Sequence, residues 1–144
     1  MTVRQATCVA IGGRGLLIEG PPGAGKSGLA LALIDRGAML VGDDGVTLEV
    51  RDGQLWALPP PNTAGLAEVR NIGLLRFPVA EARVALRLVL DPAAPRFIEH
   101  AAEQDIAGAP IPWLAFDPGI APAAFRAELA LAAHGLPLSG TATA

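Results

Sequence analysis

Short apolar stretches separated by turn residues open the chain. Thr7–Ile11 and Gly15–Glu19 are two such stretches, and Gly12-Gly13-Arg14 between them has the residues of a tight turn. Apolar runs of this length, bounded by turn signals, are typical of buried strands. We therefore predict that the two stretches pair as a β-hairpin.

A helical pattern follows a glycine-rich loop. Lys26–Arg36 places Leu29 and Leu33 at helical spacing with alanines between them, and Gly37 is a natural stop for the helix. Met39–Gly42 then returns to the pattern of a short apolar strand. The order strand, loop, helix and strand indicates an α/β fold.

The middle of the chain has the pattern of a second hairpin followed by irregular structure. Val46–Val50 and Leu55–Leu58 flank the turn Arg51-Asp52-Gly53-Gln54. The run Pro59-Pro60-Pro61-Asn62 then interrupts regular structure. We predict two paired strands here, and then a loop that leads into the extended segment Glu68–Gly73.

Strand and helix patterns return toward the carboxyl end. Val84–Leu90 and Ile111–Phe116 are predicted strands, and Pro112 places the second of them at a sheet edge. Ala121–His134 is a predicted helix, and the residues from Leu136 onward are expected to form a frayed tail. One face of this helix carries Phe125, Leu129 and Ala133.

The composition is that of one small domain with an aliphatic core. The chain has 144 residues, of which 51% are hydrophobic and 4% aromatic, so we treat residues 1–144 as a single domain. A net charge of -3 argues against a nucleic-acid partner. No apolar run approaches the roughly 20 residues that span a bilayer, and no secretory signal is recognisable, so we expect no membrane partner and a cytoplasmic location. Cys8 is the only cysteine and is expected to be a buried thiol.

The loop between the first hairpin and the helix matches the phosphate-binding pattern G-x-x-x-x-G-K-[ST] in full. Its glycines let several backbone N–H groups converge on one anion, and the helix N-terminus adds a partial positive charge. Lys26 is expected to reach the β- and γ-phosphates and the Ser27 hydroxyl to ligate Mg²⁺. The flanking strand and helix argue against a coincidental turn. The predicted nucleotide-binding residues are Gly20, Pro21, Pro22, Gly23, Ala24, Gly25, Lys26 and Ser27.

Two adjacent carboxylates, Asp43 and Asp44, close the third strand about sixteen residues after Ser27. Ligands of open α/β sheets bind at the carboxyl ends of the strands. One carboxylate there could hold Mg²⁺ and the other could accept a proton from an attacking hydroxyl. Since adjacent strand residues face opposite ways, we expect only one to face the γ-phosphate. A solvated Asp-Asp-Gly turn explains the same residues equally well.

Three further charged residues are weaker candidates. Glu68 and Arg70 share one face of an extended segment and could supply a metal ligand and a phosphate-binding cation. A surface ion pair is the simpler interpretation of that pair. Arg96 follows the strand that ends at Leu90, and taken alone it is best explained as an ordinary solvated arginine.

These segments, taken in order, resemble a known family. Gly20–Ser27, the stretch Leu33–Val46 and the run Glu68-Val69-Arg70-Asn71-Ile72-Gly73 are similar in order and spacing to the catalytic domain of HPr kinase/phosphorylase. That bacterial family phosphorylates a serine of the phosphocarrier protein HPr and removes the phosphate by phosphorolysis. The resemblance extends from about Gln5 to Phe116, and the short, single-domain form is similar to versions found in alphaproteobacteria.

The resemblance implies a fold, ligands and roles. The fold is α/β, a P-loop-containing mixed sheet of the HPr kinase and PEP carboxykinase-like type, with an N-terminal hairpin followed by the P-loop and a helix. Lys26 would bind phosphate, and Asp44 would be the general base in phosphorylation and the general acid in its reversal. Asp43 would assist Asp44 or the metal, Glu68 would join Ser27 as a metal ligand with Arg70 beside it, and Arg96 would contact phosphate. ATP and Mg²⁺ are implied as donor and cofactor, HPr as substrate, and a hexamer as the assembly.

The chain departs from the family pattern at two places that concern the chemistry. Gln5 aligns with a histidine at the start of the first strand, and glutamine carries no proton or positive charge at neutral pH. If that histidine helps to handle inorganic phosphate, phosphorolysis is the half of the reaction most affected. The segment Ala109–Trp113 lacks the basic charges that the family has near its protein substrate.

The expected function is that of an ATP-dependent serine kinase that regulates the phosphotransferase system through HPr. Two alternatives remain open at the level of sequence. One is a P-loop kinase that acts on a small molecule, and the other is an ATP-sensing binding module that transfers nothing. The motif alone fits all three, because kinases, motors and switches share it.

Overall fold

The computed structural model describes residues 1–138, which form eleven strands and two helices. In chain order these are β1 (Thr2–Arg4), β2 (Thr7–Ile11), β3 (Arg14–Glu19), α1 (Lys26–Asp35), β4 (Met39–Gly42), β5 (Val46–Arg51), β6 (Gln54–Leu58), β7 (Leu66–Val69), β8 (Gly73–Arg76), β9 (Ala82–Leu90), β10 (Ala102–Ile106), β11 (Ala109–Phe116) and α2 (Ala123–His134).

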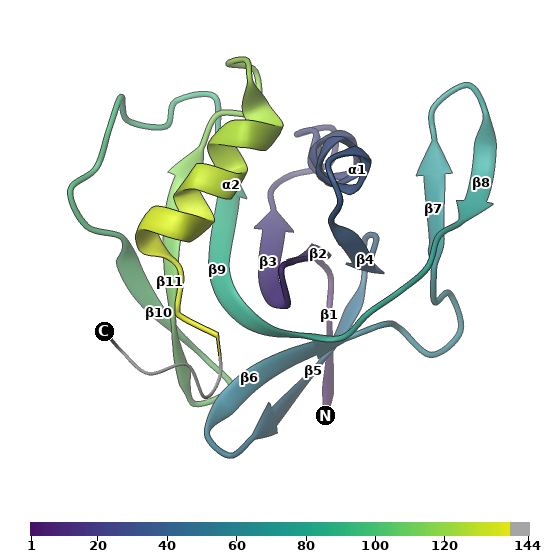
Figure 1. The fold of residues 1–144 in the computed structure, drawn as a ribbon, viewed down its shortest axis with the longest axis horizontal. Helices are drawn as coiled ribbons and strands as arrows, with labels where there is room; N and C mark the ends of the chain where they lie inside the picture. Colours follow the sequence, from purple (N-terminus) through teal and green to yellow (C-terminus); the bar gives the residue numbers. More distant parts are fainter. Residues whose placement is uncertain (139–144) are drawn as a thin grey trace.

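Nine of these strands form one curled, mixed sheet (Figure 1). Its main path is β1-β5-β6-β9-β3-β2-β4, and β11 adds to β9 with β10 outside it. The long strand β9 runs parallel to β3 on one side and to β11 on the other. The carboxyl ends of β3, β9 and β11 therefore lie at the same edge of the sheet. The remaining two strands, β7 and β8, pair only with each other and stand apart as a hairpin.

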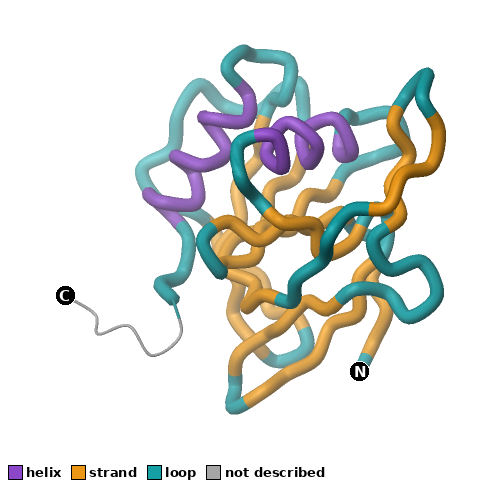
Figure 2. The backbone as a smooth tube through the Cα atoms, turned by 45° about the vertical axis from the view of Figure 1, so that its right-hand side comes forward, coloured by secondary structure: helices purple, strands orange, loops and turns teal. Residues whose placement is uncertain are grey.

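Both helices lie on one face of the sheet, as Figure 2 shows from a second direction. One apolar cluster fills the space between the helices and the sheet and includes Leu33, Leu88 and Leu131. A second cluster, with Cys8, Leu17 and Val84, lies on the opposite face, where the sheet curls around it. Within residues 1–138 neither helix is long and apolar enough to cross a membrane.

Most of the predicted elements are confirmed. The first hairpin is β2–β3 in antiparallel register, and the glycine-rich loop leads from β3 directly into α1. The second hairpin is β5–β6, with Asp52 and Gly53 in its turn. Cys8 is fully buried, and burial raises the pKa of its thiol far above the ordinary value, which excludes a thiolate nucleophile. These elements were predictable because each one is specified by local residues.

Four strands were not predicted, and the predicted sheet edge holds for only part of its strand. β7 and β8 form a hairpin whose turn, residues 70–72, interrupts the predicted extended segment Glu68–Gly73. β1 and β10 are short and mostly exposed, so they lack the apolar pattern that marks a buried strand. From Trp113 onward β11 lies inside the sheet, between β9 and β10, whereas the part that contains Pro112 pairs with β10 alone and is a local edge. Proline is tolerated there since the pairing of β11 with β9 begins only at Trp113.

The C-terminal helix presents a different face to the core from the one predicted. Phe125 and Leu129 are 46% and 50% exposed, and the helix buries Ala127 and Leu131 instead. The expectation of a frayed tail is also wrong at its start, because the Leu136 amide donates to the Ala85 carbonyl at 2.9 Å. The rest of that predicted tail, residues 139–144, lies outside the described residues.

Two glycines give a paired prediction about stability. A Cβ at Gly42 would lie 2.1 Å from the Gly45 carbonyl oxygen, whereas a Cβ at Gly28 in α1 would meet nothing within 4 Å. Gly42→Ala should lower the free energy of unfolding by about 3 kcal/mol, because the backbone must shift. Gly28→Ala should raise it by roughly 0.5–1 kcal/mol, because alanine favours the helix. Urea denaturation of both variants checks this; equal effects would contradict the close approach at Gly42.

Candidate active site

The glycine-rich loop forms a compact turn between β3 and α1. Gly23 and Gly25 have φ angles of 80° and 104°, a region that side chains other than glycine rarely adopt. The Ala24 amide donates to the Pro21 carbonyl at 3.1 Å and closes the turn. Lys26 is the first residue of α1, so the loop lies at the N-terminus of that helix. This geometry is the one that binds phosphate through backbone amides and the helix dipole.

Lys26 is held across the mouth of its own loop. Its Nζ donates to the Gly20 carbonyl at 2.8 Å and to the Pro21 carbonyl at 3.3 Å. Both acceptors are backbone oxygens, so the ammonium has no carboxylate to displace when a phosphate enters. A lysine in this place can move its charge onto the β- and γ-phosphates at little cost.

The Ser27 hydroxyl lies against the first aspartate of the acidic pair. Ser27 Oγ donates to Asp43 Oδ1 at 2.8 Å, although the two residues belong to α1 and to the end of β4. The same carboxylate oxygen accepts a second hydrogen bond, at 3.2 Å, from the hydroxyl of Thr7 in β2. The structure thus brings Ser27 and Asp43 together at one side of the loop, as their expected roles require.

Thr7 is a site residue that the sequence reasoning missed. It is fully buried, and its hydroxyl donates to Asp43 while accepting the amide of Asp44 at 3.2 Å. One hydroxyl can serve both bonds because it carries a donor and two acceptor lone pairs. A polar side chain within an otherwise apolar strand was the signal that could have revealed it.

The two aspartates occupy different environments. Asp43 is partly buried and hydrogen-bonded, whereas Asp44 is exposed and has a left-handed φ of 61°. Aspartate tolerates that conformation better than most residues. Among the described residues no hydrogen bond involves the Asp44 side chain, whereas Asp43 accepts two. The pair is therefore divided into an anchored carboxylate and one that is accessible to a reactant.

The donor set suits Mg²⁺. Ser27 and Asp43 offer a hydroxyl and a carboxylate oxygen, which are hard ligands of the kind that this ion prefers. Among residues 1–138 no group of three or more His, Cys, Asp or Glu side chains could enclose a metal by itself. Mg²⁺ fits such an open site because it usually takes one or two protein ligands and fills its shell with water and phosphate oxygens.

The other predicted site residues are not gathered around the loop. Glu68 and Arg70 are exposed at the end of the β7–β8 hairpin, where Glu68 pairs in register with Leu74. That hairpin stands beside the main sheet (Figure 1). Arg96 is exposed in the loop that leaves the carboxyl end of β9, the same edge of the sheet as the P-loop. Gln5 is exposed in the link between β1 and β2.

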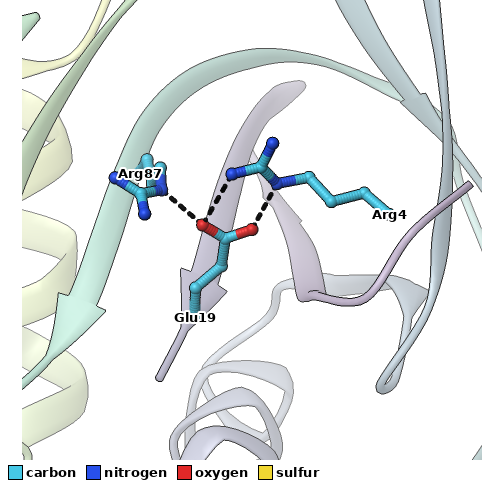
Figure 3. Close-up of polar contacts among 3 residues, drawn as sticks. All are labelled: Arg4, Glu19 and Arg87. Atoms are coloured by element: carbon cyan, nitrogen blue, oxygen red, sulfur yellow. Dashed lines mark hydrogen bonds and ion pairs between the residues drawn. The ribbon is translucent and has the colours of Figure 1, made fainter. Parts of the chain in front are cut away.

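Three charged side chains, Arg4, Glu19 and Arg87, form a cluster at the end of β3, where the P-loop begins (Figure 3). They lie on the face of the sheet opposite the two helices. Glu19, the last residue of β3, accepts hydrogen bonds from Arg4 Nε and from Arg87 Nε, and a third from Arg4 Nη2 at 3.1 Å. Arg87 also lies over the ring of Trp113, 5.6 Å from its centroid. These bonds connect strand β3 to β9 through Arg87 and to the end of β1 through Arg4. Sequence reasoning did not single out this cluster, because its members are far apart in the chain.

The Glu19 cluster gives a prediction about pH. Burial would raise the pKa of Glu19, but the hydrogen bonds and charges of Arg4 and Arg87 outweigh it and leave that pKa below the ordinary value. A depressed pKa stabilises the fold above the unfolded-state pKa of about 4.3, and this contribution is lost as the pH falls below that value. Glu19→Gln should therefore lower the free energy of unfolding at pH 7 by about 1–3 kcal/mol, with a smaller loss at pH 3.

Urea denaturation at both pH values measures this difference. Glu103→Gln, a change at an exposed position on β10, is the matched control and should show no pH-dependent difference from the wild type. If Glu19→Gln and the wild type differ equally at pH 7 and pH 3, the charge cluster does not stabilise the P-loop strand.

Three comparisons with known proteins agree with this geometry. The family model described as the HPr Serine kinase C-terminal domain matches residues 1–80. The HPr kinase/phosphorylase of Clostridium beijerinckii is 48% identical over 67 residues, which are 46% of this chain and 22% of that protein. The corresponding protein of Clostridium novyi is 46% identical over 77 residues, which are 54% of this chain and 25% of that protein. The chain thus spans a quarter or less of the length of these curated relatives.

A solved structure extends the similarity to nearly the whole fold. The HPr(Ser) kinase/phosphatase of Coxiella burnetii superposes with a TM-score of 0.79 and 28% sequence identity, covering 92% of this chain and 95% of that one. This match confirms the predicted α/β fold with a mixed sheet. The family model covers more than half of the chain, including the P-loop, the acidic pair and the β7–β8 hairpin, and the chain therefore belongs to the HPr serine kinase C-terminal domain family.

Proposed function

We propose that this domain, residues 1–144, transfers the γ-phosphoryl group of ATP to a serine of HPr, and that it also removes the phosphate by phosphorolysis. The observation that carries the proposal is the bond of 2.8 Å between Ser27 Oγ and Asp43 Oδ1 beside a complete phosphate loop. It joins the phosphate-binding end of α1 to the acidic end of β4. The names of the relatives support HPr as the protein substrate.

The binding step rests on the loop and its lysine. The backbone amides from Gly23 to Ser27 would hold the phosphate oxygens, and Lys26 would leave its two carbonyl acceptors to reach the β- and γ-phosphates. Ser27 and Asp43 would hold Mg²⁺, which supplies charge neutralisation on the transferred group when bound. Little covalent chemistry is then required of the protein, because positioning and electrostatics dominate phosphoryl transfer.

Asp44 is proposed as the proton acceptor. Its exposure leaves the carboxylate open to an incoming serine hydroxyl, while Thr7 and the left-handed backbone hold the residue next to Asp43. In the reverse direction the same group would donate the proton, as microscopic reversibility requires. Gln5, in the link before β2, cannot assist that direction with a proton of its own.

Roles for three exposed residues follow from the family alone. Glu68 is proposed as a further metal ligand, which requires the β7–β8 hairpin to approach the P-loop. Arg70 would accompany it, and Arg96 would contact phosphate from the loop after β9. Exposed arginines and a paired hairpin with few attachments to the sheet are compatible with such closure.

Incubation with γ-labelled ATP, Mg²⁺ and purified HPr tests the function. Label on a serine of HPr supports the proposal, and its release by inorganic phosphate supports phosphorolysis. Label on a metabolite in a cell extract would identify a small-molecule kinase instead. Tight ATP binding with no transfer to either acceptor would identify a sensing module, and would refute the transferase.

We also propose that the domain assembles as a homo-oligomer, hexameric by family resemblance. Ile72 and Leu74 on the β7–β8 hairpin are 70% and 68% exposed, and exposed apolar side chains of this size support a contact with a second protein surface. Light scattering of the wild type and of Leu74→Ser measures the assembly. A monomeric wild type at micromolar concentration would contradict it.

A further inference from the structure

A cleft of about 370 Å³ opens beside the P-loop, on the side away from Asp43. Its walls are the loop itself, the segment Leu90-Asp91-Pro92 after β9, and Asp117-Pro118 after β11. Sites for small molecules occupy roughly 300–1,000 Å³, so the cleft is large enough for a nucleoside-sized group. Neither the acidic pair nor the Glu19 cluster contributes to its walls.

The parallel strands explain why these three segments meet. β3, β9 and β11 run side by side in one direction, and each delivers its following loop to the same sheet edge (Figure 1). Ligands of α/β sheets bind outside the carboxyl ends of such strands. Strand β4, which leads into Asp43 and Asp44, lies on the other side of β3, beyond β2. A triphosphate in the loop with its γ-phosphate toward Asp43 therefore directs its other end toward the cleft.

The walls are held in place without any ligand. The Asp91 amide donates to the Phe116 carbonyl at 2.9 Å, which ties the loop after β9 to the end of β11. Arg126 Nη1 donates to the Asp117 and Ile120 carbonyls at 2.9 and 2.8 Å. A Cβ at Gly25 would lie 3.8 Å from Pro118, so this wall stands directly against the P-loop. The cleft is preformed and continuous with the phosphate site.

The chemistry of the walls selects the kind of group that fits. Proline rings and Leu90 offer apolar surface, and the only charged side chains in the walls are the carboxylates of Asp91 and Asp117. Each carboxylate uses Oδ1 to accept a backbone amide two residues onward, from Ala93 and from Gly119, both at 2.8 Å. Carboxylates repel phosphate but accept hydrogen bonds from hydroxyls, as an acidic residue does toward ribose in dinucleotide sites.

We propose that this cleft binds the nucleoside end of the nucleotide, with the ribose hydroxyls donating to Asp91 and Asp117 and the base lying on the prolines. The inference rests on the proposed function, since it assumes that the P-loop holds the triphosphate. It adds the residues that distinguish a nucleotide from a bare polyphosphate. These residues lie on the loops after β9 and β11, outside the phosphate-binding motif.

Calorimetric titration with three ligands in the presence of Mg²⁺ tests the proposal. The ligands are ATP, 2′,3′-dideoxy-ATP and inorganic tripolyphosphate, and the variants are Asp91→Asn and Asp117→Asn. Asparagine keeps an oxygen for the backbone amide but loses the charged acceptor. Each variant should bind ATP about tenfold more weakly, because a hydrogen bond to a charged group is lost. Wild-type protein should bind dideoxy-ATP about tenfold more weakly than ATP. Each variant should bind dideoxy-ATP with nearly the same affinity as it binds ATP, because the hydrogen bond is already lost.

Tripolyphosphate separates this role from a general effect of charge. In both variants the affinity for tripolyphosphate should stay the same or increase, whereas the affinity for ATP should decrease. Asp105→Asn is the matched control, because Asp105 also accepts a hydrogen bond from a backbone amide, that of Gly108 at 2.8 Å, but it lies near the end of β10 and outside the cleft. It should bind all three ligands like the wild type.

The outcomes distinguish this inference from the proposed function. If ATP, dideoxy-ATP and tripolyphosphate bind equally well to the wild type and to both cleft variants, the nucleoside lies elsewhere, while phosphate binding by the loop stands. If tripolyphosphate and ATP both fail to bind to the wild type, the assignment of the loop fails, and the inference falls with it.

Discussion

Replacement of Lys26 by alanine is expected to reduce phosphoryl transfer by about 10³-fold, which most assays would record as complete loss. The ammonium is the only side-chain cation placed within the loop, where it bonds to the Gly20 and Pro21 carbonyls. Without it, charge on the transferred phosphoryl group loses a preorganised partner in the transition state, a loss that costs roughly 10²–10³ for a single donor in other enzymes. Initial rates with labelled ATP measure the effect.

A second measurement for Lys26 does not depend on turnover. Lys26 is the only lysine of the chain, so an amine-reactive reagent should modify only this side chain and the N-terminus. Saturating ATP with Mg²⁺ should protect Lys26 and leave the N-terminus reactive, as peptide mass spectrometry would reveal. Arg36→Ala is the control, since Arg36 is an exposed cation at the C-terminal end of α1, where it pairs with Glu128 of α2. A Lys26→Ala protein with wild-type activity would overturn the assignment of the loop.

Replacement of Asp44 by asparagine is expected to lower turnover by about 10²–10⁴-fold, the usual contribution of general acid–base catalysis. ATP affinity should stay within about twofold, because the Asp44 side chain is exposed and, within residues 1–138, forms no hydrogen bond with the P-loop. Single-turnover rates and equilibrium binding of ATP separate the two quantities. Loss of ATP binding in this variant would assign Asp44 to the metal or to the structure.

Two further variants make the Asp44 result specific. Asp52→Asn changes an exposed aspartate with a similar left-handed φ of 51° in the β5–β6 turn, and it should leave turnover unchanged. Asp43→Asn should instead raise the Mg²⁺ concentration needed for half-maximal rate, because Asp43 shares its oxygen with Ser27. Asp44→Asn is thus expected to lower turnover, and Asp43→Asn to raise the Mg²⁺ requirement.

The phosphate loop could be predicted because its information is local. Eight consecutive residues, from the end of β3 into the first turn of α1, contain the glycines that the turn needs, the cation and the hydroxyl. The hairpins β2–β3 and β5–β6 were predictable for the same reason, since apolar runs and turn residues specify them. β10 was not, because its exposed residues, Ala102 to Asp105, gain their order from pairing with β11 and not from a pattern of their own.

The face of α2 illustrates where local pattern misleads. Phe125 and Leu129 are the large apolar residues at helical spacing, yet the helix buries the smaller Ala127 together with Leu131. The distance between helix and sheet decides which side chains fit, and that distance is a property of packing. The same holds for Leu136, whose place in the core depends on the carbonyl of Ala85 in a distant strand.

By itself, the sequence determined the phosphate loop, the flanking strand and helix, the presence of a paired carboxylate after β4 and the family resemblance, because each depends on neighbours in the chain. Only the tertiary structure decided which aspartate is anchored: Asp43 meets Ser27 and Thr7, which lie 16 and 36 residues away. It also decided the Glu19 cluster and the cleft beside the loop. These features arise where strands distant in sequence run side by side, and the hydrogen bonds that define them exist only once the sheet has formed.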